Sequence, residues 1–146
     1  MENKFCKFCD IIENKPEQKL FEDDKICIFF SIPQIAYVHM QCIPKIHIKN
    51  INSLTYKHIP LLYHMKEKAI QFLTKKYYID SNIIIMGFHI PPFNSVQHLH
   101  MHCIIPPLNN CIEKLLKVDC VMRRIDNQIY RLLKDKKNYE EINLKS

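Results

Sequence analysis

The sequence predicts an α+β domain, built on a mainly antiparallel sheet of about five strands with two principal helices. Short runs rich in β-branched and aromatic residues alternate with two long segments of helical periodicity. Most connections between the strand candidates are shorter than a parallel crossover requires, which favours antiparallel pairing. With 146 residues, 47% of them hydrophobic, the chain can form one domain with a real core.

The first part of the chain predicts one helical turn and three strands. Residues 8–15 are expected to form a short helical turn, and residues 19–24 a short strand that runs into an acidic turn. Residues 25–32, "KICIFFSI", have the composition of a strand, and "PQIA" ends it. Residues 37–44, "YVHMQCIP", predict a further strand in which a period of two gives His39 a definite face.

The middle of the chain predicts a helix at about 58–77, because Pro60 suits a helix start better than its interior. Residues at helical spacing would form its buried face: Leu61, Leu62, Met65, Ala69, Phe72 and Leu73. A strand follows at 81–89. The loop "IPPFNS" comes next, because two consecutive prolines do not fit inside a ladder.

A last strand is predicted at 96–105, ended by Pro106, and a second long helix at 109–137. We expect this helix to contact the core through Leu115, Leu116, Ile125, Ile129 and Leu132. Residues 138–146 are expected to be a loose tail. The whole chain, 1–146, would then be one domain with its core at about 6–107.

The composition excludes several classes of protein. Gly87 is the only glycine, which excludes a Gly-rich phosphate loop and leaves phosphate binding to side chains, helix ends or other amides. The formal charge of +6 gives a mild attraction to anions such as nucleotides, or it is simply a solvated surface. No run approaches the roughly 20 apolar residues of a membrane span, so no membrane partner is expected.

The amino terminus and the cysteines point to an intracellular protein. "MENKFCKFCD" contains no apolar signal core, so we expect a cytoplasmic location, with the nucleus also open. The 7 cysteines are then expected to be free thiols or metal ligands, because a disulfide frame belongs to oxidising compartments. Cys6 and Cys9 form a Cys-x-x-Cys pair, which by itself fits a metal site, free thiols or redox chemistry.

Three histidines at every second position dominate the last strand, in "QHLHMHCII". His98, His100 and His102 share one face of a regular strand, about 7 Å apart. They could lie on a solvated face, bind a metal with further ligands, or carry out covalent catalysis at phosphorus. In the third case one imidazole attacks while its neighbours fix its tautomer and neutralise the phosphate.

These motifs resemble the histidine triad (HIT) superfamily of nucleotide hydrolases and transferases. His-x-His-x-His followed by two apolar residues is similar to the superfamily signature, and "HMQCIPKIHI" and the amino-terminal stretch resemble the Hint branch. "MGFHIPPFNSVQHLHMH" is similar to the adenosine 5′-monophosphoramidases of Hint type 3. The resemblance runs from about Cys6 to Pro106 and implies a homodimer with a sheet that continues across the interface.

The resemblance implies roles for individual catalytic residues. His100 matches the nucleophile, and His102 matches the histidine that contacts the phosphate and can assist the leaving group. His98 matches the first histidine, which supports the other two. His39 matches a fourth family histidine, although a structural role for it stays open. Ser95 matches a hydroxyl residue that touches the phosphate or the leaving group.

The resemblance also implies a nucleoside pocket and a zinc site. The residues that match nucleotide-binding positions are Phe8, Phe29, Ser31, Ile32, Asn94, Ser95, His100 and His102. Ser31 stands where Hint proteins usually have an aspartate for the ribose, so it offers no bidentate carboxylate. The residues that match a closed structural zinc site are Cys6, Cys9, His47 and His98. The other cysteines are expected to be core residues, and His58, His64 and His89 surface or hydrogen-bonded residues.

The implied activity is cleavage of the P–N bond of an AMP–amine conjugate through a nucleotidyl-histidine, without an organic cofactor. The expected ligand is a purine nucleotide, AMP or an AMP conjugate, and nucleic acid is not expected as a partner. The alternatives are a sister enzyme that cleaves dinucleoside polyphosphates or adenylated DNA, and a nucleotide-binding or scaffold module without catalysis.

Overall fold

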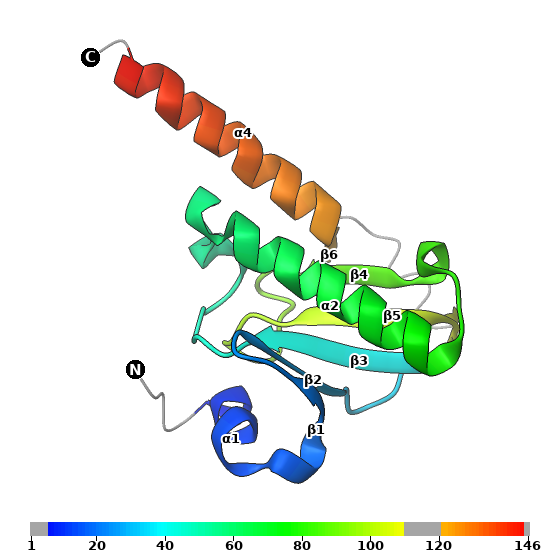
Figure 1. The fold of residues 1–146 in the computed structure, drawn as a ribbon. Coiled ribbons are helices and arrows are strands. Elements are labelled where there is room, and N and C mark those ends of the chain that lie inside the picture. The colour runs from blue at the N-terminus through cyan, green and yellow to red at the C-terminus, as the bar shows by residue number, and fades with distance from the viewer. Residues whose placement is uncertain (1–5, 110–120, 145–146) are drawn as a thin grey trace.

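The computed structural model describes residues 6–109 and 121–144 and contains one six-stranded sheet with helices on both faces (Figure 1). The strands are β1 (Lys19–Glu22), β2 (Ile26–Phe30), β3 (Ala36–Pro44), β4 (Ile85–His89), β5 (Met101–Leu108) and β6 (Met122–Arg124). The helices are α1 (Lys7–Asn14), α2 (Ile59–Tyr77) and α4 (Ile125–Leu144). Short 3₁₀ turns are η1 (Pro16–Gln18), η2 (Ile51–Ser53), η3 (Tyr56–His58) and η4 (Ser81–Ile83).

The sheet has the order β1-β2-β3-β5-β4-β6, and every neighbouring pair is antiparallel. This confirms the predicted α+β class, with six strands instead of about five. β5, which contains His102 and directly follows His98 and His100, lies between β3 and β4 and is therefore central. Its position brings His39 of β3 and His89 of β4 next to it.

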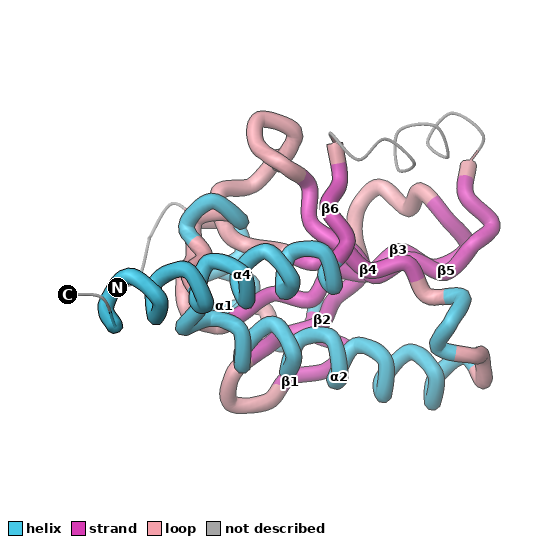
Figure 2. The backbone as a smooth tube through the Cα atoms, turned by 90° about the horizontal axis from the view of Figure 1, so that it is seen from above, coloured by secondary structure: helices cyan, strands magenta, loops and turns pink. Residues whose placement is uncertain are grey.

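The two faces of the sheet have different partners. α2 and the first part of α4 cover one face, where the main core lies between them and the apolar side chains of the strands, and the rest of α4 extends beyond the sheet (Figures 1 and 2). Leu62, Met65 and Leu73 of α2 are buried there. On the other face, α1 packs through Phe8 and Ile11 against side chains of β2 and β3. The triad histidines lie on this second face, because the intervening Leu99 and Met101 belong to the main core.

Two predicted helices have the expected character. α2 begins at Ile59 with Pro60 in its first turn, which confirms the predicted start, because proline lacks only an N–H that a first turn leaves unpaired. α1 spans eight residues, two turns where one was predicted. Its buried residues, Phe8, Cys9 and Ile11, share one side of the helix, so packing extends it beyond its weak intrinsic propensity.

The predicted bounds of the histidine strand were wrong at both ends. β5 begins at Met101 instead of residue 96, and it continues through Pro106 and Pro107 to Leu108. Pairing with β4 reaches only as far as Ile104, and the pairing with β3 shifts register after Val38. The two prolines are exposed and fall where ladder donors are not needed, so they do not end the strand.

The predicted C-terminal helix was also wrong in its bounds. The described part contains the short strand β6 before α4, and the helix starts at Ile125 instead of residue 109. It continues to Leu144, through most of the segment predicted to be loose, with Lys136–Glu140 and Lys137–Glu141 pairs at helical spacing. Ile125, Ile129 and Leu132 are buried as predicted. Leu115 and Leu116 lie outside the described residues.

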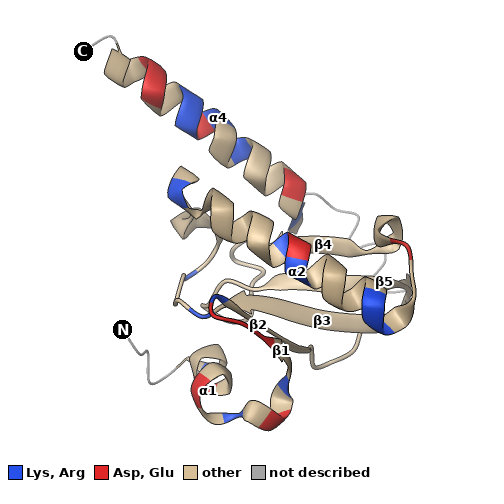
Figure 3. Cartoon of the chain, viewed as in Figure 1, with Lys and Arg blue, Asp and Glu red and all other residues tan. Residues whose placement is uncertain are grey.

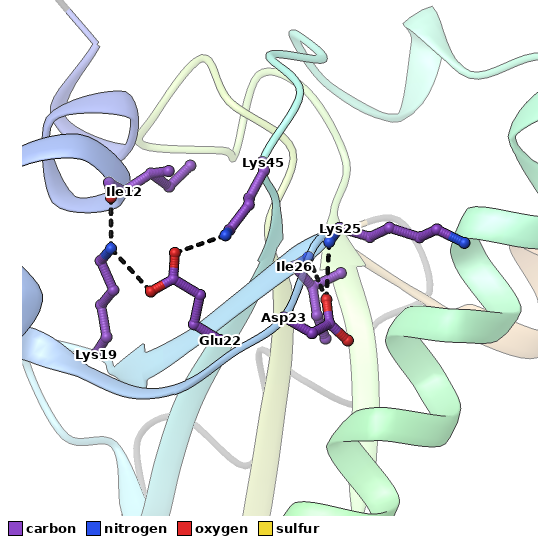
Figure 4. Close-up of polar contacts among 7 residues, drawn as sticks. All are labelled: Ile12, Lys19, Glu22, Asp23, Lys25, Ile26 and Lys45. Atoms are coloured by element: carbon purple, nitrogen blue, oxygen red, sulfur yellow. Dashed lines mark hydrogen bonds and ion pairs between the residues drawn. The ribbon is translucent and has the colours of Figure 1, made fainter.

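A polar network ties the N-terminal helix to the sheet (Figure 4). The Lys19 ammonium donates to the Ile12 carbonyl of α1 and contacts Glu22, whose carboxylate also lies 2.6 Å from Lys45 Nζ. Asp23 accepts from two backbone amides of the β1–β2 turn. Lys45 begins the segment that leads to His47, so this network helps to hold α1 and that segment together.

The edges of the sheet bear on the predicted dimer. β6 pairs with the outer side of β4, so β1 and β6 form the two sheet edges in the described residues. A sheet that continued into a second copy would do so through one of these two strands. The homodimer stays a prediction. None of the described helices has the length and apolarity to cross a membrane.

Candidate active site

His100 is held as a neutral imidazole with one ring nitrogen available. Its Nδ1 lies 2.7 Å from the backbone carbonyl of His98, and because a carbonyl only accepts, Nδ1 must carry the proton. Nε2 then has the lone pair. It is buried and has no hydrogen-bond partner among the described residues. A buried, unprotonated imidazole nitrogen without a partner is equipped to act as a nucleophile.

His102 and His39 form a hydrogen-bonded imidazole pair. His39 Nε2 lies 2.8 Å from His102 Nδ1, and the two rings are stacked with centroids 5.1 Å apart. His102 Nε2 is buried without a described partner, close to the ring of His100. When His39 donates in this pair, His102 carries its proton on Nε2 and presents a donor beside the nucleophile.

Burial keeps these imidazoles uncharged. It lowers the pKa of His39 to about 4, lowers the pKa of His100, and holds that of His102 well below its usual 6.5, with repulsion from neighbouring imidazoles adding to the shift. All three rings are therefore neutral at pH 7. A neutral ring is required for attack by His100, since protonation would occupy the lone pair.

His98 faces a different group of residues. Its Nε2 donates to the Pro44 carbonyl at 2.8 Å, which leaves the lone pair on Nδ1. Nδ1 lies 3.5 Å from the sulfurs of both Cys6 and Cys9, and Cys9 Sγ lies 3.4 Å from His47 Nδ1. The four ligand atoms lie within 4.8 Å of one another. The structure thus brings together all four residues predicted as metal ligands.

Four of the residues predicted to bind the nucleotide line a small hollow beside the histidines, and Ser31, Asn94, His100 and His102 lie outside its lining. Phe8, Phe29, Ile32 and Ser95 surround a space of about 90 Å³ between α1, β2 and the loop before β5. The Phe8 ring meets those of Phe29 and His100 edge to face, with centroids 5.3 Å apart in both pairs. Ile32 is 90% exposed, so it stands at the rim of the hollow instead of forming its wall.

Ser31 and Asn94 occupy polar positions near this hollow. Ser31 is buried, and its hydroxyl accepts from the Gln41 side-chain amide at 3.2 Å. Gln41, which also lines the hollow, has no role in the sequence-based prediction. Asn94 Oδ1 is buried without a described partner, and its amide reaches the Val96 carbonyl at 3.4 Å.

His89 is the main residue that the sequence did not place at the site. It was expected to be a surface or hydrogen-bonded histidine, but its ring centroid lies 4.3 Å from that of His102. Ring nitrogens of His89, His100 and His102 lie within 4.8 Å of one another. The pairing of β4 with β5 places His89 at the site. Gly87 of β4 is the partner of His102, and His89 stands two residues further on the same face.

A larger hollow lies away from these groups. It has a volume of about 540 Å³ and lies between α2 and β1, lined by Phe21, Phe72, Lys68, Lys75 and other residues. It belongs to the face covered by the helices, opposite the histidines, and it contains no histidine or cysteine. The histidines and cysteines described above lie apart from it, on the other face of the sheet.

Known proteins resemble this chain in sequence and in fold. Residues 5–117 match the family model for scavenger mRNA decapping enzyme C-term binding. Over 108 residues the chain is 39% identical to the bifunctional adenosine 5′-phosphosulfate phosphorylase/adenylylsulfatase HINT4 of Arabidopsis thaliana, covering 72% of this chain and 73% of that protein. Over 104 residues it is 34% identical to the adenosine 5′-monophosphoramidase HINT3 of Mus musculus, covering 69% of this chain and 63% of that protein.

The chain thus spans less than two thirds of the mouse protein. Among solved structures, a histidine triad protein from Clostridium difficile has a TM-score of 0.66 and 25% identity, covering 75% of this chain and 98% of that one. The match to the family model, residues 5–117, includes the three histidines, the strand β3 and the helix α2. Fold, motif and sequence similarity agree, and the chain belongs to the histidine triad superfamily, near its HINT3-type members.

Proposed function

We propose that this histidine triad hydrolase cleaves the P–N bond of a purine nucleoside phosphoramidate, an AMP–amine conjugate, through a nucleotidyl-His100 intermediate. The observation that carries the proposal is the state of His100. Its Nδ1 is bonded to the His98 carbonyl, and its Nε2 is buried without a described partner beside His102. This arrangement supports attack by Nε2 on the α-phosphorus.

The reaction balances with the groups present. As His100 Nε2 bonds to phosphorus, the P–N bond of the substrate breaks and its electron pair stays on the leaving nitrogen. The leaving nitrogen takes its proton from solvent water, while His102 Nε2–H donates a hydrogen bond to the phosphate in the tautomer that the 2.8 Å hydrogen bond from His39 holds. Water then attacks phosphorus, the bond to His100 breaks and its electron pair returns to Nε2, AMP leaves, and the proton released by water passes to solvent.

The hollow between α1 and β2 supports binding of the nucleoside. Phe8 and Phe29 offer aromatic faces for a purine, and Ile32 stands at the entrance. Ser31 and Gln41 are the polar groups placed for the ribose, and Ser95 lies on the side of the phosphate. Since a serine–amide pair offers no carboxylate, the hydroxyls of the ribose would be held by neutral hydrogen bonds, which are weaker than charge-assisted ones.

We also propose that Cys6, Cys9, His47 and His98 bind one structural zinc ion. Tetrahedral zinc with Zn–S of about 2.3 Å and Zn–N of about 2.0–2.1 Å separates sulfur and nitrogen ligands by roughly 3.5 Å. The 3.4 and 3.5 Å separations between the cysteine sulfurs and the histidine nitrogens match this value. His98 donates its other ring nitrogen to Pro44, as metal-bound histidines usually do. With four protein ligands, the ion would support structure and leave no position for substrate.

Turnover of matched substrates tests the proposed activity. A fluorogenic AMP phosphoramidate, a diadenosine polyphosphate and an adenylated DNA strand would be compared at equal concentration. We expect the highest kcat/KM for the phosphoramidate, because it requires only one nucleoside position, and the chain offers one aromatic hollow next to the catalytic histidines. Preference for either other substrate would assign the chain to a sister activity. AMP binding with no turnover of all three would identify a binding module.

A further inference from the structure

The arginines of this chain are gathered at one edge of the sheet. The sequence contains 21 lysines and arginines together, but its arginines are only Arg123, Arg124 and Arg131. Arg123 and Arg124 lie in β6, and Arg131 lies in the first two turns of α4. Lysine serves as the cation everywhere else. Arginine differs from lysine in its planar fork of donors, which binds carboxylate, phosphate and sulfate in a bidentate manner.

Strand register places Arg124 on the catalytic face. Gly87 of β4 pairs with Arg124 on one side and with His102 on the other, and paired residues share a face. Arg123 has the opposite orientation, because it pairs with the core residue Phe88 and donates to Gln128 of α4. Arg124 is exposed and lies two strands from His102, about 10 Å between backbones. Gly87 lies between them, and the end of the Met122 side chain packs over it, so the Arg124 side chain has to reach past Met122.

On the histidine face of the sheet, the nucleoside and the leaving group of a substrate are expected on opposite sides of the phosphorus. The nucleoside hollow lies over β2 and β3, and the unpartnered nitrogens of His100 and His102 lie at β5. A group leaving the phosphorus on the side away from the nucleoside lies over β4 and then β6. Strands β2 to β5 carry no Lys, Arg, Asp or Glu, as their uniform tan colour in Figure 3 shows. Of the six described strands, only β1 and β6 carry formal charge on their side chains.

We propose that Arg124 binds an oxyanion on the leaving group, so that the preferred substrates are AMP conjugates whose leaving portion carries a carboxylate, sulfate or phosphate. The inference rests on the proposed function and adds the class of leaving group. Arg124 touches the leaving group and takes no part in proton transfer. The P–N bond breaks as described above, and the guanidinium contributes only its charge and its hydrogen-bond donors.

A pair of conjugates that differ only in one charge tests this inference. AMP joined through nitrogen to glycine carries a free carboxylate, and AMP joined to glycinamide does not. The wild-type protein is expected to favour the glycine conjugate in kcat/KM by about tenfold, the value of one charge-assisted hydrogen bond. Arg124→Gln should reduce this preference about tenfold, and Arg124→Lys should restore part of it, since lysine supplies a point charge without the fork.

The variant Arg131→Gln distinguishes a direct contact of Arg124 with the leaving group from a general effect of positive charge. Arg131→Gln removes the same charge from α4, away from the catalytic face, and should keep the wild-type preference. Adenosine 5′-phosphosulfate provides a second arm: a loss of its turnover in Arg124→Gln, with the glycine preference unchanged, would assign the contact to sulfate instead of carboxylate. Both arms are measured at low and high salt, because an exposed cation acts less strongly at high ionic strength.

The outcomes separate the two proposals. If the wild-type protein hydrolyses both conjugates without preference, or if Arg124→Gln keeps the wild-type preference in both arms, the Arg124 contact is wrong and the phosphoramidase proposal stands. An equal loss in Arg131→Gln would likewise contradict a specific contact. If the wild-type protein hydrolyses neither conjugate and no phosphosulfate, the proposed function itself is wrong, and this inference falls with it.

Discussion

Hydrogen bonds to single ring nitrogens give the histidines different tasks. His100 has Nδ1 on a carbonyl and Nε2 towards the site, whereas His98 has Nε2 on a carbonyl and Nδ1 towards two cysteines. The two residues stand two positions apart in the same motif. Their tautomers are opposite because different acceptors lie beside each ring. The motif supplies three imidazoles, and the backbone around them decides which nitrogen of each is reactive.

The burial of His39 predicts a pH dependence of stability. Its pKa is about 4 in the folded protein, below the usual 6.5, so the unfolded chain takes up a proton first as the pH falls. The contribution of neutral His39 to the free energy of unfolding is complete above pH 6.5. It is lost as the pH falls from 6.5 towards 4. We expect the free energy of unfolding to decrease by up to about 1.4 kcal/mol per pH unit from this residue alone.

Urea denaturation of the wild type and His39→Asn at several pH values between 7.5 and 4.5 measures this contribution. The variant lacks the titrating ring, so its stability should depend less steeply on pH below 6.5. Parallel pH profiles for the two proteins would show that His39 does not resist protonation in the folded state.

At the scale of elements, β6 explains several features together. It extends the sheet beyond β4, joins the histidine face to α4, and carries two arginines. Its close approach to β4 depends on the single glycine of the chain. A Cβ at Gly87 would lie 2.6 Å from the Arg123 carbonyl oxygen and 2.8 Å from Met122 Cε. Backbone cannot move aside as easily as a flexible side chain, so the strand pair requires glycine here.

Gly87→Ala is therefore expected to destabilise the protein by about 1–3 kcal/mol, the usual cost of overpacking a filled position. Chemical denaturation measures the loss, and amide hydrogen exchange should show it concentrated in β6 and the start of α4. A variant as stable as the wild type, with unchanged exchange in β6, would mean that the strand does not pack on β4 as described.

At the scale of the whole molecule, the Cys6–Cys9 segment connects the amino terminus to the catalytic strand. His98 belongs to the four-residue cluster and, through its carbonyl, fixes the proton of His100. Zinc at this cluster would thus stabilise the position of the nucleophile from behind without touching the substrate.

Elemental analysis of protein purified without chelators is expected to find about one zinc per chain. Cys6→Ser and Cys9→Ser should each lose the metal and lower the Tm, because a structural zinc site contributes directly to folding. Cys103→Ala is the matched control: this thiol is also buried, but it lies in the core under α2 and should leave the zinc content unchanged. Wild-type protein that is stable and free of metal would contradict the site.

The sequence predicted the central elements well and the C-terminal part poorly. The pattern of β2, β3 and α2 is long and regular, so periodicity and Pro60 determine it locally. β6 has only three residues and owes its existence to pairing with β4, which no local pattern reveals. His89 was missed for the same reason. Strand pairing brings His89 close to His100 and His102. The residues next to His89 in the sequence indicate only the end of a strand.

The central claim is that His100 Nε2 takes the nucleotidyl group, and trapping of this adduct tests it most directly. An AMP phosphoramidate labelled in the α-phosphate would be mixed with excess protein, quenched within milliseconds under alkaline conditions, and the labelled peptide mapped by mass spectrometry. We predict one labelled residue, His100, and no label in a His100→Ala variant that still binds AMP. Turnover by the wild type without label, or label that persists in His100→Ala, would contradict the account.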